Sequence, residues 1–305
     1  MSTSSPLASP TLSTRTVSDY LSCLQVVMVN TTLPANIGSA ARAMHTMGLS
    51  RLTVVNPKHP IDDTSVSHAA GGSDVLAAAK ITPSLEAAIG NCQLVFAASS
   101  RSRHLPRPVV TPTEAAKIML DFINGQINID KQSAIDQKNA TDSQANRDSD
   151  KPNIAILFGR EDRGLTNEEL AYADYHIQID ANPAYPVLNV ASAVQVIASF
   201  IFAYAQTHVN AVNKAIDNDE DNLDTAVQPT LGLHTRQQWD EPAITQQQLQ
   251  QLTGRTTELM IQRGLADADH LKSLPARLSR LGSRVQLDQK EYQLLSALIA
   301  KLLKD

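Results

Sequence analysis

The stretch NIAILFGREDRGLT, residues 153–166, decides the fold. Its first half is apolar and rich in β-branched residues, which predicts a strand that is buried on both faces. Its second half places four charged residues between Gly159 and Gly164, and charges directly after a strand are poor core material. Ligands of open α/β sheets bind at the carboxyl ends of strands, so this turn is a candidate site. A plain charged surface turn is the alternative.

Similar apolar runs recur along the chain, with helical patterns between them. The further runs are residues 24–29, 51–55, 93–98 and 175–179, and the helical patterns cover residues 36–47, 112–123, 167–173 and 190–206. This alternation predicts an α/β fold whose mostly parallel sheet has helices on both faces. Thr111 and Thr166 each precede a glutamate by three residues, which predicts capped helix starts.

Polar stretches divide the chain into parts. Residues 1–20 are rich in Ser, Thr and Pro without an apolar core, which predicts a disordered lead rather than a signal peptide. The central domain is expected over residues 21–207, with a polar surface insertion at 125–152. Residues 208–243 predict an acidic linker.

The last part, residues 244–305, predicts a small, all-helical C-terminal extension. Thr245 with Gln248, and Asp288 with Glu291, have the spacing of capping boxes for helices over 246–263 and 289–303.

Composition excludes several classes of protein. A net charge of −5 and a pI of about 5.9 argue against an indiscriminate nucleic-acid binder. We expect no membrane span, because no window approaches the roughly 18 apolar residues that one needs. Cys23 and Cys92 lie in or beside apolar runs, so we expect two buried thiols and a cytoplasmic protein. No metal site is expected.

Two further stretches combine polar residues with a predicted helix start. In NIGSAAR, Asn36 to Arg42, small residues permit close packing and Arg42 offers donors for a phosphate or ribose oxygen, although an alanine-rich core helix is the alternative. In YPVLNVASAV, residues 185–194, Asn189 precedes the last helix of the domain, and a simple helix cap is the alternative there.

Taken in order, the three stretches resemble the signature motifs of the SPOUT methyltransferases, the TrmH-like trefoil-knotted class. The sequence is most similar to the TrmJ-like subgroup, which consists of tRNA 2′-O-methyltransferases that act on cytidine or uridine at position 32. The loop ASSRSRHLP, residues 98–106, and the tail from Leu274 onward resemble that subgroup too. The resemblance implies a deep trefoil knot, a rare exception to unknotted chains.

The resemblance also implies S-adenosylmethionine as methyl donor, held by three backbone loops in the knot. The cofactor-binding residues implied are Ala98, Ser99, Leu157, Gly159, Ile179, Leu188 and Asn189. The family usually has Thr at Ala98 and Ser at Val187, so this chain departs from the pattern at both positions.

The implied catalytic residues are Arg42, Asn36, Glu161 and Asn189. Arg42 matches the arginine to which the family assigns activation of the ribose 2′-hydroxyl, and Glu161 is expected to brace Arg42 or an RNA group. A guanidinium stays protonated in proteins, so orienting the oxygen and stabilising its charge is chemically easier for Arg42 than acting as a base.

The implied partners are tRNA and a second copy of the chain. The expected RNA contacts are Arg101, Arg103, Arg107, Arg277, Arg280 and Arg284, with a solvated basic face as the alternative. The family forms homodimers through the knot helices, here including residues 190–206, with the site assembled from both protomers.

Three other functions stay open. The same chemistry could act on another tRNA position or on ribosomal RNA. A non-catalytic RNA-binding module on the same fold is disfavoured because Arg42, Glu161 and Asn189 are all present. An NAD-dependent oxidoreductase is disfavoured because the chain has no G-x-G-x-x-G turn.

Overall fold

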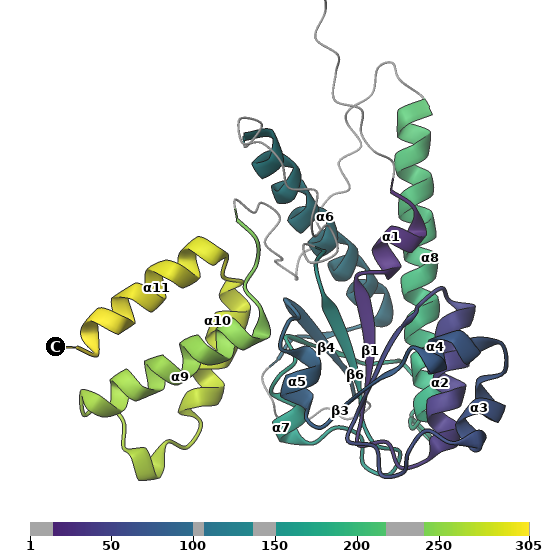
Figure 1. The fold of residues 1–305 in the computed structure, drawn as a ribbon, viewed down its shortest axis with the longest axis horizontal. Helices are drawn as coiled ribbons and strands as arrows, with labels where there is room; N and C mark the ends of the chain where they lie inside the picture. Colours follow the sequence, from purple (N-terminus) through teal and green to yellow (C-terminus); the bar gives the residue numbers. More distant parts are fainter. Residues whose placement is uncertain (1–14, 100–106, 137–150, 218–240, 305) are drawn as a thin grey trace, which may run out of the picture.

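The computed structural model describes residues 15–99, 107–136, 151–217 and 241–304. Within these residues, seven parallel strands form one sheet in the order β3-β2-β1-β6-β4-β7-β5 (Figure 1). The strands are β1 (Leu24–Val29), β2 (Arg51–Val55), β3 (Lys80–Thr82), β4 (Leu94–Ala98), β5 (Val109–Val110), β6 (Ile154–Phe158) and β7 (Tyr175–Ile177). The predicted α/β class is therefore confirmed, while the threading of the chain into a knot stays a prediction.

Side chains alternate along the central strands between two apolar layers, because successive residues of a strand point to opposite faces. On β1, Val26 and Met28 join one layer, whereas Val27 and Val29 join the other. The first layer packs against α1 (Val17–Leu21), α2 (Pro34–Thr46), α6 (Pro112–Asp136) and α8 (Val190–Asp217), and the second against α5 (Leu85–Ile89) and α7 (Asn167–Leu170). Helices thus cover both faces of the sheet, as predicted.

The segment between β2 and α5 holds elements that sequence analysis did not predict. They are α3 (Asp63–Ala69), a 3-10 turn (Ala70–Gly72), α4 (Ser73–Ala77) and β3. Helix α3 and the 3-10 turn lie very close to α2. A Cβ on Gly38 of α2 would stand 2.0 Å from the carbonyl oxygen of Ser65, and a Cβ on Gly72 would stand 2.7 Å from the backbone of Ala41. Glycine is required at both positions, and α2 is thereby held firmly.

Three helices extend into stretches for which we predicted no helix. α1 occupies the end of the predicted disordered lead, because Thr16 and Asp19 form a capping box and Tyr20 is buried. α6 continues to Asp136, into the predicted insertion, and α8 continues to Asp217, into the predicted linker. A helix that is already nucleated adds one hydrogen bond for each residue, so it can continue without an apolar pattern.

Residues Val190–Ala211 of α8 are long and apolar enough to cross a membrane, with a mean hydropathy of 1.4, so the expectation that no such window exists was wrong. This finding is weak evidence for a span, because the core helix of a globular domain has the same composition. Val194, Ile197 and Ile201 are buried in the layer shared with α2 and α6.

The C-terminal extension is all helical, as predicted. It consists of α9 (Gln246–Gln262), a 3-10 turn (Ala268–His270), α10 (Leu274–Val285) and α11 (Gln289–Leu302), and both predicted capping boxes are present. Leu249, Leu252, Leu287 and Ile299 belong to a small core of its own.

A buried carboxylate joins the extension to the central domain. Asp174, at the start of β7, accepts a 2.8 Å hydrogen bond from the backbone amide of Val95 and a 3.2 Å bond from Nε2 of Gln246. The backbone amide of Gln246 also donates to the carbonyl of Cys92 at 2.7 Å. Burial raises the pKa of Asp174, against the hydrogen bonds and the nearby Arg107 guanidinium that lower it. The start of α9 is therefore anchored to the sheet.

Both cysteines are free and buried, as predicted. Burial raises the pKa of the Cys92 thiol to about 12, so this side chain is a small apolar group and not a nucleophile.

Candidate functional site

A pocket of about 160 Å³ lies at the carboxyl ends of β4, β6 and β7. Five of the predicted cofactor-binding residues line it, namely Ala98, Ser99, Gly159, Ile179 and Leu188. Leu157 does not line the pocket, because strand alternation turns its side chain into the opposite apolar layer. Asn189 lies just beyond the lining, between Leu188 and Val190.

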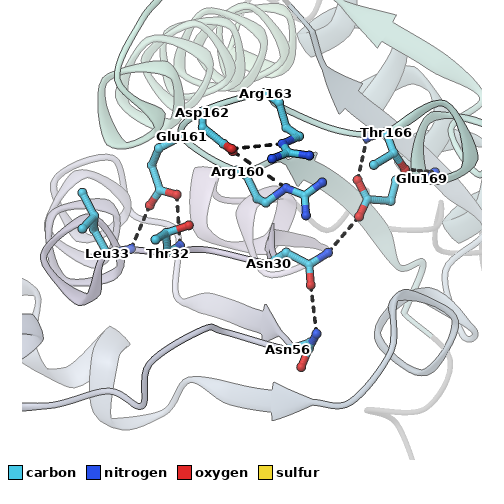
Figure 2. A network of polar contacts seen from close by, with 10 residues as sticks. All are labelled: Asn30, Thr32, Leu33, Asn56, Arg160, Glu161, Asp162, Arg163, Thr166 and Glu169. Carbon is cyan, nitrogen blue, oxygen red and sulfur yellow. Dashed lines mark hydrogen bonds and ion pairs between the residues drawn. The ribbon is translucent and has the colours of Figure 1, made fainter.

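Glu161 closes the open start of α2. Its carboxylate accepts hydrogen bonds from the backbone amides of Thr32 at 3.0 Å and Leu33 at 3.2 Å, and from Nδ2 of Asn36 at 2.9 Å (Figure 2 shows the two backbone contacts). Leu33, the N-cap residue of α2, has no side-chain capping bond of its own. Burial alone would raise the pKa of Glu161, but these hydrogen bonds outweigh it and hold the pKa below its ordinary value. The side chain is therefore an anion placed at a helix N-terminus.

Asn36 links Glu161 to Asn189, in the third motif (residues 185–194). Its Oδ1 accepts a 3.0 Å hydrogen bond from Nδ2 of Asn189, whose own Oδ1 accepts from the backbone amide of Ala191 and so caps α8. One continuous chain of hydrogen bonds thus joins Glu161, Asn36 and Asn189, which are up to 153 residues apart in sequence. The cap predicted as an alternative role for Asn189 is present together with this contact.

The turn from Gly159 to Gly164 is folded tightly on itself. Arg160 and Gly164 form an isolated β-bridge, and a Cβ on Gly159 would stand 2.2 Å from the backbone of Gly164 and Leu165. Gly164 itself has φ +68°, a conformation that favours glycine. The two glycines of the motif are therefore required by the backbone.

The polar contacts continue from this turn to the ends of β1 and β2 (Figure 2). Asn30 donates from Nδ2 to Glu169 at 2.9 Å and accepts from Asn56 at 3.0 Å, and Glu169 also accepts from the backbone amide of Thr166 at 2.7 Å. Both asparagines have positive φ, which Asn tolerates better than most residues. This network fixes α7 behind the pocket.

Arg42 lies apart from this network. It is exposed on α2, does not line the pocket, and has no hydrogen-bond or ion-pair partner for its side chain among the described residues. Glu161 does not contact Arg42 in the single chain, because its carboxylate is occupied by the start of α2, and the alternative that Glu161 braces an RNA group stays a prediction.

The predicted RNA-contacting arginines have different surroundings. Arg107 is half-buried and donates from Nη2 to the carbonyl of Ala171 at 2.8 Å, and burial lowers its pKa, so its position argues against a phosphate contact. Arg277 and Arg284 are exposed on α10, and Arg280 is half-buried. Arg101 and Arg103 lie outside the described residues.

Several lining residues were not named individually as cofactor-binding, although Phe158 and Pro186 lie within the backbone loops that were expected to hold the donor. Phe158, Leu165 and Ile177 form apolar walls, and Arg160, Asp162 and Pro186 lie at the rim. Ile177 could have been found, because the last residue of a strand beside the motif must approach the same edge. Among the described residues, no group of three His, Cys, Asp or Glu is placed to hold a metal ion.

The pocket fits a ligand that has an apolar ring and polar groups beside it. Ala98 and Gly159 let a ligand approach the backbone, and Phe158, Ile177 and Leu188 offer apolar contact. The carboxylates of Glu161 and Asp162 lie beside the guanidinium groups of Arg160 and Arg163, so the charged residues of the lining balance. Its volume is below the roughly 300 Å³ at which pockets for drug-sized ligands begin, so a larger ligand must extend over the rim beside Val187.

Comparisons with known proteins agree with this arrangement. Residues 23–199 match the SpoU rRNA Methylase family. The chain is 31% identical over 281 residues to the tRNA (cytidine/uridine-2′-O-)-methyltransferase TrmJ of Citrobacter koseri, covering 92% of this chain and 96% of that protein. It is 30% identical over 283 residues to the tRNA (cytidine/uridine/adenosine-2′-O-)-methyltransferase TrmJ of Pseudomonas aeruginosa, covering 92% and 94% of the two chains.

Solved structures share the fold. TrmJ from Z. mobilis ZM4 superposes with a TM-score of 0.66 at 23% identity, covering 91% of this chain and 98% of that one. A probable methylase family protein from Haemophilus influenzae superposes with a TM-score of 0.50 at 30% identity, covering 93% and 97%. The likeness includes the helical extension as well as the central domain.

Proposed function

The chain belongs to the SpoU rRNA methylase family, and from that premise we propose that it methylates a ribose 2′-hydroxyl of tRNA, at cytidine or uridine 32 of the anticodon loop. The chain is a methyltransferase by this membership. The observation that carries the finer proposal is its similarity over 96% of the length of a tRNA 2′-O-methyltransferase. The hydrogen-bond chain from Glu161 through Asn36 to Asn189 supports it, since the three motifs meet at one edge of the sheet.

We propose S-adenosylmethionine as the methyl donor, which when bound supplies an electrophilic methyl group on a sulfonium. Phe158, Ile177 and Leu188 are suited to hold its adenine, and the backbone at Ala98 and Gly159 can reach the ring edge.

In this proposal Arg42 acts on the ribose. A guanidinium donates hydrogen bonds and does not accept a proton, so Arg42 orients the 2′-oxygen and stabilises its developing negative charge. Glu161 and Asn36 are positioning residues in this scheme, because they fix the start of the helix that carries Arg42.

We also propose a homodimer through α8, with the site assembled from two protomers. The exposed ring of Phe200, 43% accessible on α8, supports such an interface. A second protomer would also explain how Arg42 reaches a pocket that it does not line in its own chain. We place the reaction in the cytoplasm, consistent with two free thiols.

The proposal is tested by incubating the protein with labelled donor and unmodified total RNA, then mapping the methylated nucleotide. Arg42→Ala should abolish methyl transfer while donor affinity, measured by calorimetry, stays within about twofold. His45→Ala is the matched control, because His45 is exposed on the same helix. Methylation of ribosomal RNA or of another tRNA position would redirect the proposal, and loss of donor affinity in Arg42→Ala would overturn the role given to Arg42.

A further inference from the structure

A second, larger hollow lies on the other side of α7. It is a groove of about 910 Å³. Ala171 and Tyr172, which follow α7, form one side of the groove, and helices α9 and α10 of the extension form the other. Gln250, Gly254 and Ser279 are among its lining residues. Neither the family membership nor the cofactor pocket accounts for this groove.

The groove wall is mostly apolar, with Ile261, Pro275 and Leu303 among its residues, and it also holds one aromatic ring and several uncharged hydrogen-bonding groups. Amides come from Gln246, Gln250 and Gln262, and hydroxyls come from Thr253, Thr257 and Ser279. Nε2 of Gln250 is buried without a hydrogen-bond partner among the described residues, so a donor is left for an acceptor that enters the groove.

Tyr172 is fixed in place at the groove wall. Its hydroxyl donates to the carboxylate of Glu86, on α5, which holds the ring from behind. Burial raises the pKa of Tyr172 to about 12, so the ring is neutral. A fixed neutral aromatic ring is a stacking platform for a planar group.

The charges favour a base over a phosphate inside the groove. Among the lining residues that the structure describes, none is Lys or Arg, and Glu168 and Glu258 lie at its exposed edge. The exposed cations Arg277 and Arg284 lie on α10, outside the lining. Phosphates would be held outside the groove by these side chains.

The groove and the cofactor pocket share a wall. Gly164 and Leu165 line the pocket, Thr166 caps α7, and Glu168 and Ala171 line the groove. The two hollows are therefore separated by the single turn of α7.

We propose that this groove binds an unpaired nucleobase of the RNA substrate, close to the nucleotide that is methylated. The proposal rests on the proposed function and names a recognition subsite for it. The base stacks on Tyr172, and its acceptor edge meets the amide of Gln250. A protein segment is the other class of occupant, but the shared wall with the cofactor pocket favours the RNA.

Gly254 provides a selective way to block the groove. A Cβ at this position would meet nothing within 4 Å, and the residue lies inside α9, so a larger side chain can project into the groove without disturbing the packing. Replacing glycine inside a helix also favours the helix. Gly254→Phe therefore fills the groove, and Gly254→Ala is the matched control that leaves it open.

The full-length protein is assayed with an unmodified tRNA transcript for KM, kcat and tRNA affinity, and with S-adenosylmethionine for donor affinity. We expect Gly254→Phe to raise the KM and the Kd for tRNA about tenfold, the size of one lost stacked base, with donor affinity unchanged. Gly254→Ala should match the wild type, and Gln250→Leu should raise the tRNA Kd several-fold.

Unchanged tRNA affinity in a folded Gly254→Phe protein would overturn the proposal that the groove binds a nucleobase. An equal loss of tRNA affinity in Gly254→Ala would overturn it as well. Wild-type protein that binds tRNA but never methylates it would refute the proposed function and leave the groove standing. If Gly254→Phe keeps its tRNA affinity but no longer binds a partner protein, the nucleobase proposal is overturned and the groove is a binding site for a protein segment.

Discussion

Replacement of Glu161 by alanine should destabilise the protein measurably, because three donors at the start of α2 would lose their acceptor. Removing a capping acceptor costs about 0.5–2 kcal/mol, and hydrogen bonds to a charged group lie at the upper end of the range for single bonds. Glu161 is only half-buried, so water replaces part of what is lost. We expect a loss of about 2 kcal/mol in the free energy of unfolding.

That loss corresponds to a fall of roughly 4–8 °C in Tm for a chain of this size, measured by calorimetry and by urea unfolding. Glu161→Gln is the matched variant. One oxygen can still accept from Leu33 and Asn36, while the new amide faces the Thr32 donor. Its stability should fall between those of the wild type and Glu161→Ala.

The pH dependence gives a second measurement. The pKa of Glu161 is lower in the folded protein than its ordinary value, so its stabilisation is fully present above the ordinary pKa, about 4.3, and is lost as pH falls through the folded pKa. The difference in unfolding free energy between wild type and Glu161→Ala should therefore stay constant from pH 8 to about 5.5 and shrink below about pH 4. Equal stability of the two proteins at pH 7, or a difference that persists unchanged at pH 3, would refute the reasoning.

Two further predictions concern the junction and the interface. Asp174→Ala should lower the free energy of unfolding by about 3 kcal/mol and increase hydrogen exchange in α9, because the Val95 amide and Gln246 lose a buried acceptor; unchanged exchange in α9 would contradict the anchoring role. Phe200→Glu should convert the proposed dimer to a monomer in light scattering, since it places a charge on the exposed face of α8, and a dimer of unaltered mass would move the interface elsewhere.

The sheet was largely predictable because its central strands are continuous apolar runs between turns. β1 and β2 have the predicted bounds, and β4 and β6 begin one residue later than predicted. The strand Lys80–Thr82 was missed because it is short, mostly exposed and at the edge of the sheet, so it has no apolar signal. The helices α3 and α4 were missed because they span only 7 and 5 residues, too few for a helical apolar pattern to show.

The site was predictable in its members but not in all of its contacts. Asn36, Glu161 and Asn189 were identified as polar residues at strand and helix ends, and those ends meet at one edge. The partner of Glu161 was not predictable, because a carboxylate that caps a helix from 125 residues away is a tertiary contact without a local pattern. Alternation along β6 could have excluded the side chain of Leu157 from the pocket.

The turn between Gly159 and Thr166 is pinned at three places: by Glu161 on α2, by the bridge between Arg160 and Gly164, and by Asn30 acting on Glu169. Such a segment is already ordered before any ligand arrives. Association then carries little entropic penalty for ordering this loop, so that part of the binding energy is not lost. A ligand should therefore find this wall of its pocket as a preorganised surface.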